Sequence, residues 1–205
     1  MKIEWKKTEK NFYLPGGNPT VVDIPKMKYF CINGVGNPNH EAFQEKITVL
    51  YGLAYGVRMM PKSGFAPVGY EEYTVYPLEG IWDLTEEGRR TSSLDKDQLV
   101  YKIMIRQPDF VTQEVFDLAK AKVNKKSPIT LLDQVSFEEI EDGHCVQMMH
   151  IGTFDSEYLS FVRMDEYLKA QGMSRKSKIH KEIYISDFRK TKPEELKTVL
   201  RYFVK

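Results

Sequence analysis

The sequence predicts an α+β fold built from two similar modules, and three observations support this prediction. Residues 178–187 alternate between apolar and polar side chains, as a β-strand with one buried face does. Residues 40–60 repeat apolar side chains every three or four positions, as an amphipathic helix does. The order strand, glycine, helix, strand occurs twice, over residues 29–106 and 143–187. This internal duplication is a match of pattern rather than of residue identity.

Length and composition narrow the class of protein. A chain of 205 residues can bury a sizeable core, as one large domain or two small ones. The formal net charge is +1 and charges of both signs are interspersed, which argues against binding nucleic acid through charge. The chain has no run of about 18 apolar residues and no charged-then-apolar leader, so we predict neither a membrane span nor a signal peptide. The two cysteines, Cys31 and Cys145, lie in apolar runs and are expected to be core thiols in a reducing cytoplasm.

The first module follows an N-terminal extension at residues 1–25, which we expect to be partly helical at best and to end in a loop. Asn39 is the expected N-cap of the helix at 40–60, and Thr112 that of a second helix reaching about Asn124. A polar loop is predicted at 84–97. The predicted strands share apolar runs bounded by glycine, proline or polar residues, and they cover residues 28–36, 70–77, 78–83 and 98–106.

The second module follows a basic break at 125–128. A strand at 135–141 and a return strand at 144–152 are predicted to form a hairpin around Asp142-Gly143. Asp155 is the expected cap of a helix that runs to about Ala170 and stops at Gly172. After the strand at 178–187, the capping-box spacing of 191–194 predicts a short helix through Leu196 and Leu200.

Glu182 is the main candidate for chemistry. His180 and Tyr184 flank it at i±2 on one side of the predicted strand. If that face is wet, Glu182 is an ordinary surface residue; if it lines a pocket, Glu182 is the pocket's only acid. An apolar pocket favours the neutral acid and a nearby hydroxyl or cation favours the anion, so either a proton donor or a general base is consistent with the pattern.

The predicted duplication places further residues near Glu182. A pseudo-symmetric sheet would lay Lys102 and Met104 across from Glu182 and Tyr184, on the face away from the helices, and the interface of two such halves is a natural concave site. Twelve tyrosines, 11 phenylalanines and nine methionines supply material for a pocket that accepts lipophilic ligands. Tyr70, in the strand at 70–77, is a further candidate for ligand contact.

Several chemistries have no motif in the sequence. There is no glycine-rich phosphate loop, no His-x-x-x-His, no Cys-x-x-Cys and no nucleophile-elbow serine. The four histidines show no metal-ligand spacing. We therefore expect neither a metal nor another cofactor.

Three motifs resemble those of GyrI-like small-molecule-binding proteins. Residues 180–191 with 194–201 resemble the ending of that family, Pro77-Leu78-Glu79-Gly80-Ile81-Trp82 resembles its tryptophan motif, and residues 22–38 resemble its opening. The resemblance runs from about residue 20 to the end. It implies a GyrI-like domain at 26–205, with pseudo-repeats of about 26–124 and 134–205, next to the extension at 1–25.

The resemblance also implies a site. Relatives carry duplicated strand–helix–strand–strand modules in one antiparallel sheet, with helices on one face and a ligand groove on the other. Their acidic groove residue maps onto Glu182 and their aromatic wall onto Trp82, while Asp83 departs from the second aromatic residue that relatives often carry there. Some stand-alone members hydrolyse isothiocyanates and open cyclopropane-bearing alkylators, with a tyrosine assisting the glutamate; Tyr184 and then Tyr55 are the candidates here.

Two functions stay open at this stage. One is a bacterial, cytoplasmic detoxifying hydrolase in which Glu182 activates water. The other is a protein that binds and sequesters drugs, or that partners a larger protein such as a topoisomerase, with Glu182 as counter-ion. Regulators of this family carry a helix-turn-helix module, and about 25 residues before the first strand are too few for one, so we expect no direct contact with nucleic acid.

Overall fold

The computed structural model describes residues 2–126 and 130–205, so the basic break at 125–128 lies partly outside the described residues. Contacts divide the chain into two compact units. Unit 1 comprises Met1–Glu4, Met27–Leu78 and Leu84–Ile140, and unit 2 comprises Trp5–Lys26, Glu79–Asp83 and Glu141–Lys205. Each unit consists of segments that are not consecutive in the sequence, so the units are not the first and second halves of the chain. The pseudo-repeat boundaries stay a prediction.

The described residues form six strands that pair in the closed order β1-β3-β2-β5-β6-β4. Strand β1 pairs antiparallel with β3, and β6 pairs antiparallel with both β4 and β5. The predicted α+β class with one antiparallel sheet is confirmed. The strands are β1 (Thr20–Val35), β2 (Leu78–Leu84), β3 (Leu99–Gln107), β4 (Ser136–Ile151), β5 (Arg175–Tyr184) and β6 (Lys197–Val204).

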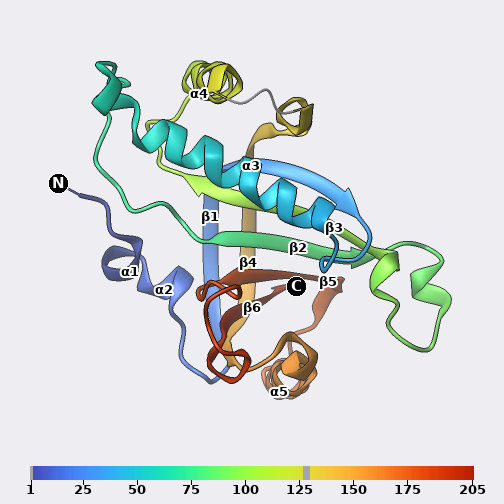
Figure 1. The fold of residues 1–205 in the computed structure, drawn as a ribbon. Coiled ribbons are helices and arrows are strands. Elements are labelled where there is room, and N and C mark those ends of the chain that lie inside the picture. Colours follow the sequence, from blue (N-terminus) through green and yellow to red (C-terminus); the bar gives the residue numbers. More distant parts are fainter. Residues whose placement is uncertain (1, 127–129) are drawn as a thin grey trace. The chain divides into compact units, whose positions relative to one another are not determined.

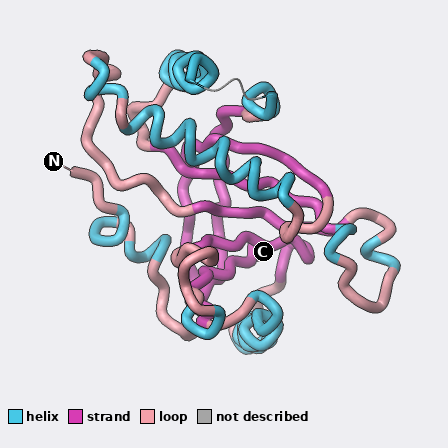
Figure 2. The backbone as a smooth tube through the Cα atoms, in the orientation of Figure 1, coloured by secondary structure: helices cyan, strands magenta, loops and turns pink. Residues whose placement is uncertain are grey.

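The helices of the described residues differ greatly in length. They are α1 (Trp5–Thr8), α2 (Lys10–Tyr13), α3 (Glu41–Arg58), α4 (Gln113–Lys126) and α5 (Glu157–Ala170). Short 3₁₀ turns lie at Met60–Ser63, Gly88–Arg90, Lys96–Gln98, Thr130–Gln134, Phe154–Ser156 and Pro193–Glu195. Two of them lie in the polar segment between β2 and β3, where the sequence predicts a connecting loop (Figure 2).

In unit 1, α3 packs against α4 and β3 (Figure 1). The predicted apolar stripe of α3 is buried at Phe43, Ile47, Leu50, Ala54 and Val57. The predicted N-cap Asn39 is wrong, because His40 holds that position while the backbone N–H of Asn39 donates to the side chain of Asn37. Thr112 caps α4 as predicted, its Oγ1 accepting from the backbone N–H of Val115 at 3.3 Å.

The predicted strand at 70–77 is wrong. Only Tyr73 makes a β-bridge, with Ile3, and β2 begins at Leu78. Side chains hold this segment to α3 instead: the buried Tyr73 hydroxyl donates to the carbonyl of Ala54 at 3.1 Å, and Arg58 Nε donates to the carbonyl of Tyr73 at 2.8 Å. This segment is therefore fixed by side-chain hydrogen bonds to α3 rather than by the ladder of a strand.

The predicted hairpin at Asp142-Gly143 is also wrong, because β4 runs without interruption from Ser136 to Ile151. Gly143 has φ +66°, which favours glycine and lets the strand bend at this point. The carboxylate of Asp142 is buried and paired with Lys181 and Arg201, so this residue cannot serve as an exposed turn. Cys31 and Cys145 are buried free thiols, as predicted.

The predicted helix through Leu196 and Leu200 is wrong as well. A single 3₁₀ turn at Pro193–Glu195 precedes β6, which pairs with β4 on one side and β5 on the other. The residues with capping-box spacing do form a turn. The apolar residues after this turn are buried on both faces of β6, which is a central strand.

In unit 2, α5 packs on one face of β4 and β6. It begins at Glu157, with Ser156 rather than the predicted Asp155 as N-cap, and Gly172 follows its end with φ +68°. The core beneath it consists of buried apolar side chains from the helix and the strands: Val146, Met148, Met164, Leu168, Leu200, Tyr202 and Val204.

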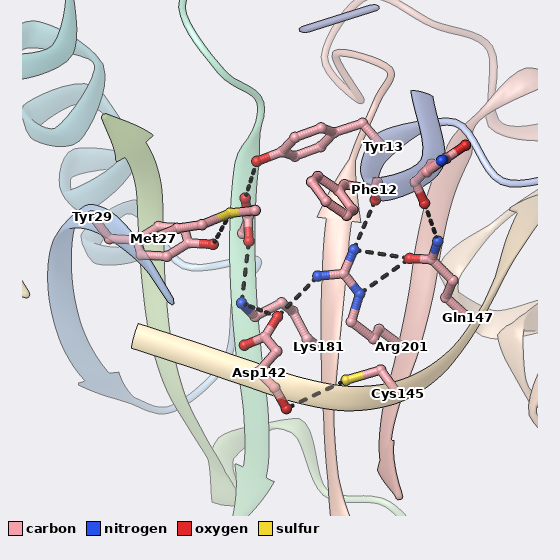
Figure 3. Close-up of polar contacts among 11 residues, drawn as sticks. Phe12, Tyr13, Met27, Tyr29, Asp142, Cys145, Gln147, Lys181 and Arg201 are labelled. Atoms are coloured by element: carbon pink, nitrogen blue, oxygen red, sulfur yellow. Dashed lines mark hydrogen bonds and ion pairs between the residues drawn. The ribbon is translucent and has the colours of Figure 1, made fainter. Parts of the chain in front are cut away.

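The other face of these strands carries a buried charged cluster. Lys181 is fully buried, with Nζ 2.7 Å from Asp142 Oδ2 and 3.3 Å from Glu79 Oε2. Arg201 donates to the same Asp142 oxygen at 2.9 Å (Figure 3). We call Glu79, Asp142, Gln147, Lys181 and Arg201 the ion cluster. Two cations and two carboxylates balance its charge, as burial requires.

The ion cluster also fixes the N-terminal extension, which the sequence predicts to be partly helical at best. Arg201 donates to the carbonyl of Phe12 at 2.7 Å and Gln147 to the carbonyl of Asn11 at 2.6 Å (Figure 3). The hydroxyl of Tyr13 donates to Glu79 at 3.3 Å. Helix α2 thus supplies hydrogen-bond partners to buried polar groups of the ion cluster.

The ion cluster predicts a pH-dependent contribution to stability. Burial alone would raise the pKa of Asp142, but Lys181 and Arg201 outweigh it and hold the pKa below its usual value. A lowered carboxyl pKa stabilises the fold above the unfolded pKa, and this contribution is lost as the pH falls through the folded pKa. We expect Asp142→Ala to lower the free energy of unfolding by about 3–5 kcal/mol at pH 7, because it leaves two buried cations with a single buried carboxylate, Glu79.

Chemical denaturation between pH 7 and pH 3 measures this effect, and the difference from wild type should shrink toward acid. Glu141→Ala, at the exposed neighbouring position on β4, is the matched control and should change the free energy by less than about 0.5 kcal/mol. A cost for Asp142→Ala as small as that of the control would show that the ion cluster does not stabilise the fold.

Candidate functional site

Strand β5 presents the candidate site on one of its two faces. Lys181 and Ile183 are buried toward the ion-cluster side, whereas His180, Glu182 and Tyr184 are partly buried on the opposite side. The period of two predicted from the sequence is confirmed, although β5 ends at Tyr184, before Ile185. In register, His180 pairs with Tyr202 and Glu182 with Leu200 of β6, both of which lie in the core under α5. Glu182 therefore lies on the α5 side of the strands, and the predicted position on the face away from the helices is wrong.

A chain of hydrogen bonds joins four of the residues that the sequence singles out. Trp82 Nε1 donates to the hydroxyl of Tyr184 at 2.8 Å, and that hydroxyl donates to Glu182 Oε2 at 2.7 Å. His180 Nε2 lies 3.0 Å from Glu182 Oε1 and is the donor, since a carboxylate only accepts. The side chain of Glu182 is 12% exposed. The face is therefore not an ordinary wet surface, and Glu182 is held in one orientation.

Gly80 permits the contact between Trp82 and Tyr184. A Cβ atom at this position would lie 2.7 Å from Trp82 Nε1 and 3.3 Å from the Tyr184 hydroxyl. In the sequence, Gly80 lies in the motif Pro77-Leu78-Glu79-Gly80-Ile81-Trp82. A glycine inside a strand indicates close approach by another group, and that signal was present.

Glu157 is a functional candidate that the sequence analysis missed, and it corrects the expectation that Glu182 is the only acid. Glu157 is 6% exposed, and its carboxyl hydrogen-bonds to Glu182. It is the first residue of α5 and shares one helix face with Phe161, Met164 and Leu168, at spacings of four, three and four. An acidic residue on a core-facing stripe is unusual, and this was the signal available in the sequence.

Burial shapes the protonation of the site. Burial raises the pKa of Glu157 well above its usual value, and the neighbouring charge of Glu182 and the hydrogen bond to it raise it further. The pKa of Tyr184 is also raised, first by burial and then by Glu182 and Glu157, while the hydrogen bond from Trp82 opposes this. These shifts favour the neutral, protonated forms of both Tyr184 and Glu157.

Aromatic rings surround these polar groups. The ring of Phe161 meets His180 edge-on with centroids 5.0 Å apart, and Phe154 meets Tyr184 in the same way at 6.0 Å. The ring centroids of Phe188 and Phe154 are 6.3 Å apart. Phe154 is 39% exposed, so one aromatic surface next to Tyr184 is open to solvent.

The remaining predicted residues belong to unit 1 and have other partners there. Lys102 Nζ pairs with Glu138 at 2.6 Å, and Met104 is fully buried. Tyr55 is 48% exposed on α3, and the Tyr70 hydroxyl donates to the carbonyl of Arg58 at 2.8 Å. Their predicted roles at the Glu182 site stay predictions.

A second contact, between Ser156 and His150, is structural. Ser156 Oγ lies 3.2 Å from His150 Nε2, but its own proton goes to the carbonyl of Thr153 at 2.7 Å. His150 therefore does not take the serine proton, and the arrangement is no nucleophile–base pair.

Within residues 2–126 and 130–205, no three histidine, cysteine or acidic side chains gather as metal ligands would. None of the described helices has the length and apolar character needed to cross a bilayer.

Comparison with known proteins gives the chain a family context. The model of the GyrI-like small molecule binding domain matches residues 17–204. A structure of a hydrolase from Listeria innocua is similar at 36% identity and TM-score 0.92, covering 100% of both chains. Another hydrolase structure from that organism shows 35% identity and TM-score 0.90, covering 99% of this chain and 100% of its own.

More distant similarity concerns the fold alone. The C-terminal domain of EcmrR has 12% identity and TM-score 0.53, with 92% of this chain and 97% of that domain covered. The comparison with curated proteins found no match.

The hydrogen-bond chain predicts a spectroscopic effect of Tyr184→Phe. This change removes the acceptor for Trp82 Nε1 and a donor to Glu182, so the indole N–H resonance of Trp82 should move upfield. Stability should fall by about 1–3 kcal/mol, because buried polar groups lose their partners. Nitrogen-15 NMR measures the shift, and Trp5, the other tryptophan, is the internal control. An unmoved Trp82 resonance would show that the Trp82–Tyr184 bond does not form in solution.

Proposed function

Because the chain belongs to the GyrI-like small molecule binding family, we propose that the site around Glu182 binds hydrophobic, aromatic small molecules and hydrolyses electrophilic ones. Similarity to the two Listeria hydrolases, at 35% and 36% identity over essentially the full chain, supports an enzymatic role. The proposed substrates are isothiocyanates and cyclopropane-bearing alkylators, as the family resemblance implies.

The observation that carries this proposal is the setting of Glu182. Its two oxygens accept from Tyr184 at 2.7 Å and from His180 at 3.0 Å, and its side chain is mostly buried. Each carboxylate oxygen has two lone pairs, so Glu182 can still accept a hydrogen bond from a water molecule. A fixed carboxylate in a poorly solvated site can remove a proton from that water as it attacks a substrate.

The roles of the neighbours follow from their contacts. Tyr184 orients the carboxylate, and Trp82 in turn orients Tyr184. Of the two candidate tyrosines, the geometry supports Tyr184, because Tyr55 is half exposed in unit 1 with its ring centroid 6.3 Å from that of Tyr51. The exposed ring of Phe154 is suited to contact a flat, lipophilic substrate next to Glu182.

A second candidate function is binding without chemistry. Two carboxyl groups next to aromatic rings also suit a cationic aromatic ligand, for which Glu182 is the counter-ion and the rings of Phe154 and Phe161 supply cation–π contacts. This function predicts saturable binding and no product.

A product assay separates the two functions. Benzyl isothiocyanate, and separately a cyclopropane-bearing alkylator, would be incubated with catalytic amounts of protein and analysed by mass spectrometry. We expect turnover by wild type and a loss of about 10²–10⁴-fold in kcat/KM for Glu182→Gln, because the amide cannot accept a proton from water.

Glu166→Gln, at an exposed position on α5, is the control and should behave as wild type. Turnover that survives in Glu182→Gln would remove Glu182 from the catalytic role. Intact substrates together with saturable quenching of tryptophan fluorescence would instead support a binding protein.

A further inference from the structure

The mechanism above leaves Glu157 without a role, although its surroundings are unusual. Glu157 is buried, and no lysine, arginine or histidine pairs with it within the described part of the chain. Its Oε1 has no hydrogen-bond partner among the described residues, while its carboxyl hydrogen-bonds to Glu182. Two carboxyl groups can share a hydrogen bond only when one of them carries a proton.

The contacts determine which group carries that proton. Glu182 accepts from both Tyr184 and His180, and these donors stabilise a negative charge on it. Among residues 2–126 and 130–205, Glu157 has no such charge-stabilising donor, and burial disfavours its charged form. Asp155, in the turn before α5, adds a further negative charge that acts on Glu157 in the same sense. The pair therefore consists of an anionic Glu182 and a neutral Glu157.

The other proton donors near Glu182 are less suited to act as an acid. The Tyr184 hydroxyl already donates to Glu182, and its raised pKa opposes loss of its proton. The Trp82 N–H is committed to Tyr184 and does not ionise in the accessible pH range. A neutral carboxyl group gives up a proton far more readily than a phenol or an indole.

We infer that Glu157 is the general acid of this site: it protonates the substrate atom that gains electrons while Glu182 takes a proton from the attacking water. The inference rests on the proposed hydrolase function and adds a second catalytic carboxyl group to it. Pairs of carboxyl groups whose surroundings separate their protonation states are a recurrent way to assign acid and base.

The step balances for an isothiocyanate, R–N=C=S. The water oxygen bonds to the central carbon, and one water proton passes to Glu182. The π electrons of the C=N bond move to nitrogen, which takes the proton of Glu157, giving the thiocarbamic acid R–NH–C(=S)–OH. This acid breaks down to the amine R–NH₂ and carbonyl sulfide. Glu182 then returns its new proton to Glu157 through their shared hydrogen bond, so the pair is restored without an additional reactant.

This arrangement defines a substrate class. The site favours neutral electrophiles in which attack at carbon places electrons on another atom of the substrate that must be protonated. A substrate whose leaving atom needs no proton gains nothing from Glu157.

The test compares wild type, Glu157→Gln and Glu166→Gln as full chains, with benzyl isothiocyanate as the substrate and benzylamine as the measured product. Glutamine keeps the shape and can donate to Glu182, but it cannot release a proton. We expect Glu157→Gln to lower kcat/KM by about 10²–10⁴-fold. The wild-type kcat/KM should fall as the pH rises, because Glu157 loses the proton that it donates. This fall should be absent in Glu157→Gln.

Thermal unfolding gives a readout that does not depend on turnover. Because the folded pKa of Glu157 is raised, the folded state binds more protons than the unfolded state, and stability falls as the pH rises through the range between the two pKa values. The difference in Tm, Glu157→Gln minus wild type, should therefore increase as the pH rises above about 4.3. Glu166→Gln should show no such trend.

The outcomes separate this inference from the proposed function. Turnover that is lost in Glu182→Gln but keeps its wild-type rate and pH profile in Glu157→Gln would overturn the acid role alone. A Tm difference that is independent of pH would overturn it as well, because Glu157 would then carry no extra proton. No turnover by wild type would overturn both the hydrolase and the acid role.

Discussion

The buried ion pairs of Lys181 are the constraint on which the candidate site depends. Side chains alternate along a strand, so fixing Lys181 in the ion cluster turns its neighbour Glu182 to the opposite face. The same holds in β2, where Glu79 pairs with Lys181 and the next residue, Gly80, lies against Trp82 and Tyr184. If β5 shifted by one residue against its neighbouring strands, Glu182 would enter the ion cluster and Lys181 would lie among aromatic rings. Buried charge on one face of β5 therefore sets the register of the candidate site on the other face.

Helix α5 links the hydrophobic core to the same site. Met164 and Leu168 pack on the core of unit 2, and one and two turns earlier the same helix face presents Phe161 to His180 and Glu157 to Glu182. Apolar packing thus places an acid where it could not stay if it were charged and unpaired. The free energy lost in burying Glu157 is offset by the core that the helix covers. Such local cost at a functional site is typical of groups with shifted protonation.

Much of this arrangement could be predicted from the sequence where the signal is local. Alternation along β5 separates Glu182 from its buried neighbours, and the spacing in α3 gives its buried stripe. Long-range effects were out of reach: Asp142-Gly143 has the sequence of a hairpin turn, but two cations from β5 and β6 hold Asp142 inside. Residues after Pro193 have helical spacing, but pairing on both sides makes them a strand. Glu157 lay on a predicted helix, yet only the packed helix shows that it faces Glu182.

Glu157 and Glu182 are proposed to share a single proton, which Glu157 holds. Carbon-13 NMR of protein labelled at the glutamate carboxyl carbons tests this most directly, with the two signals assigned by their loss in Glu157→Gln and Glu182→Gln. The account predicts that at neutral pH the Glu157 carbon has the chemical shift of a protonated carboxyl and moves only at higher pH. A Glu157 signal that coincides at neutral pH with those of the exposed, ionised glutamates would contradict it.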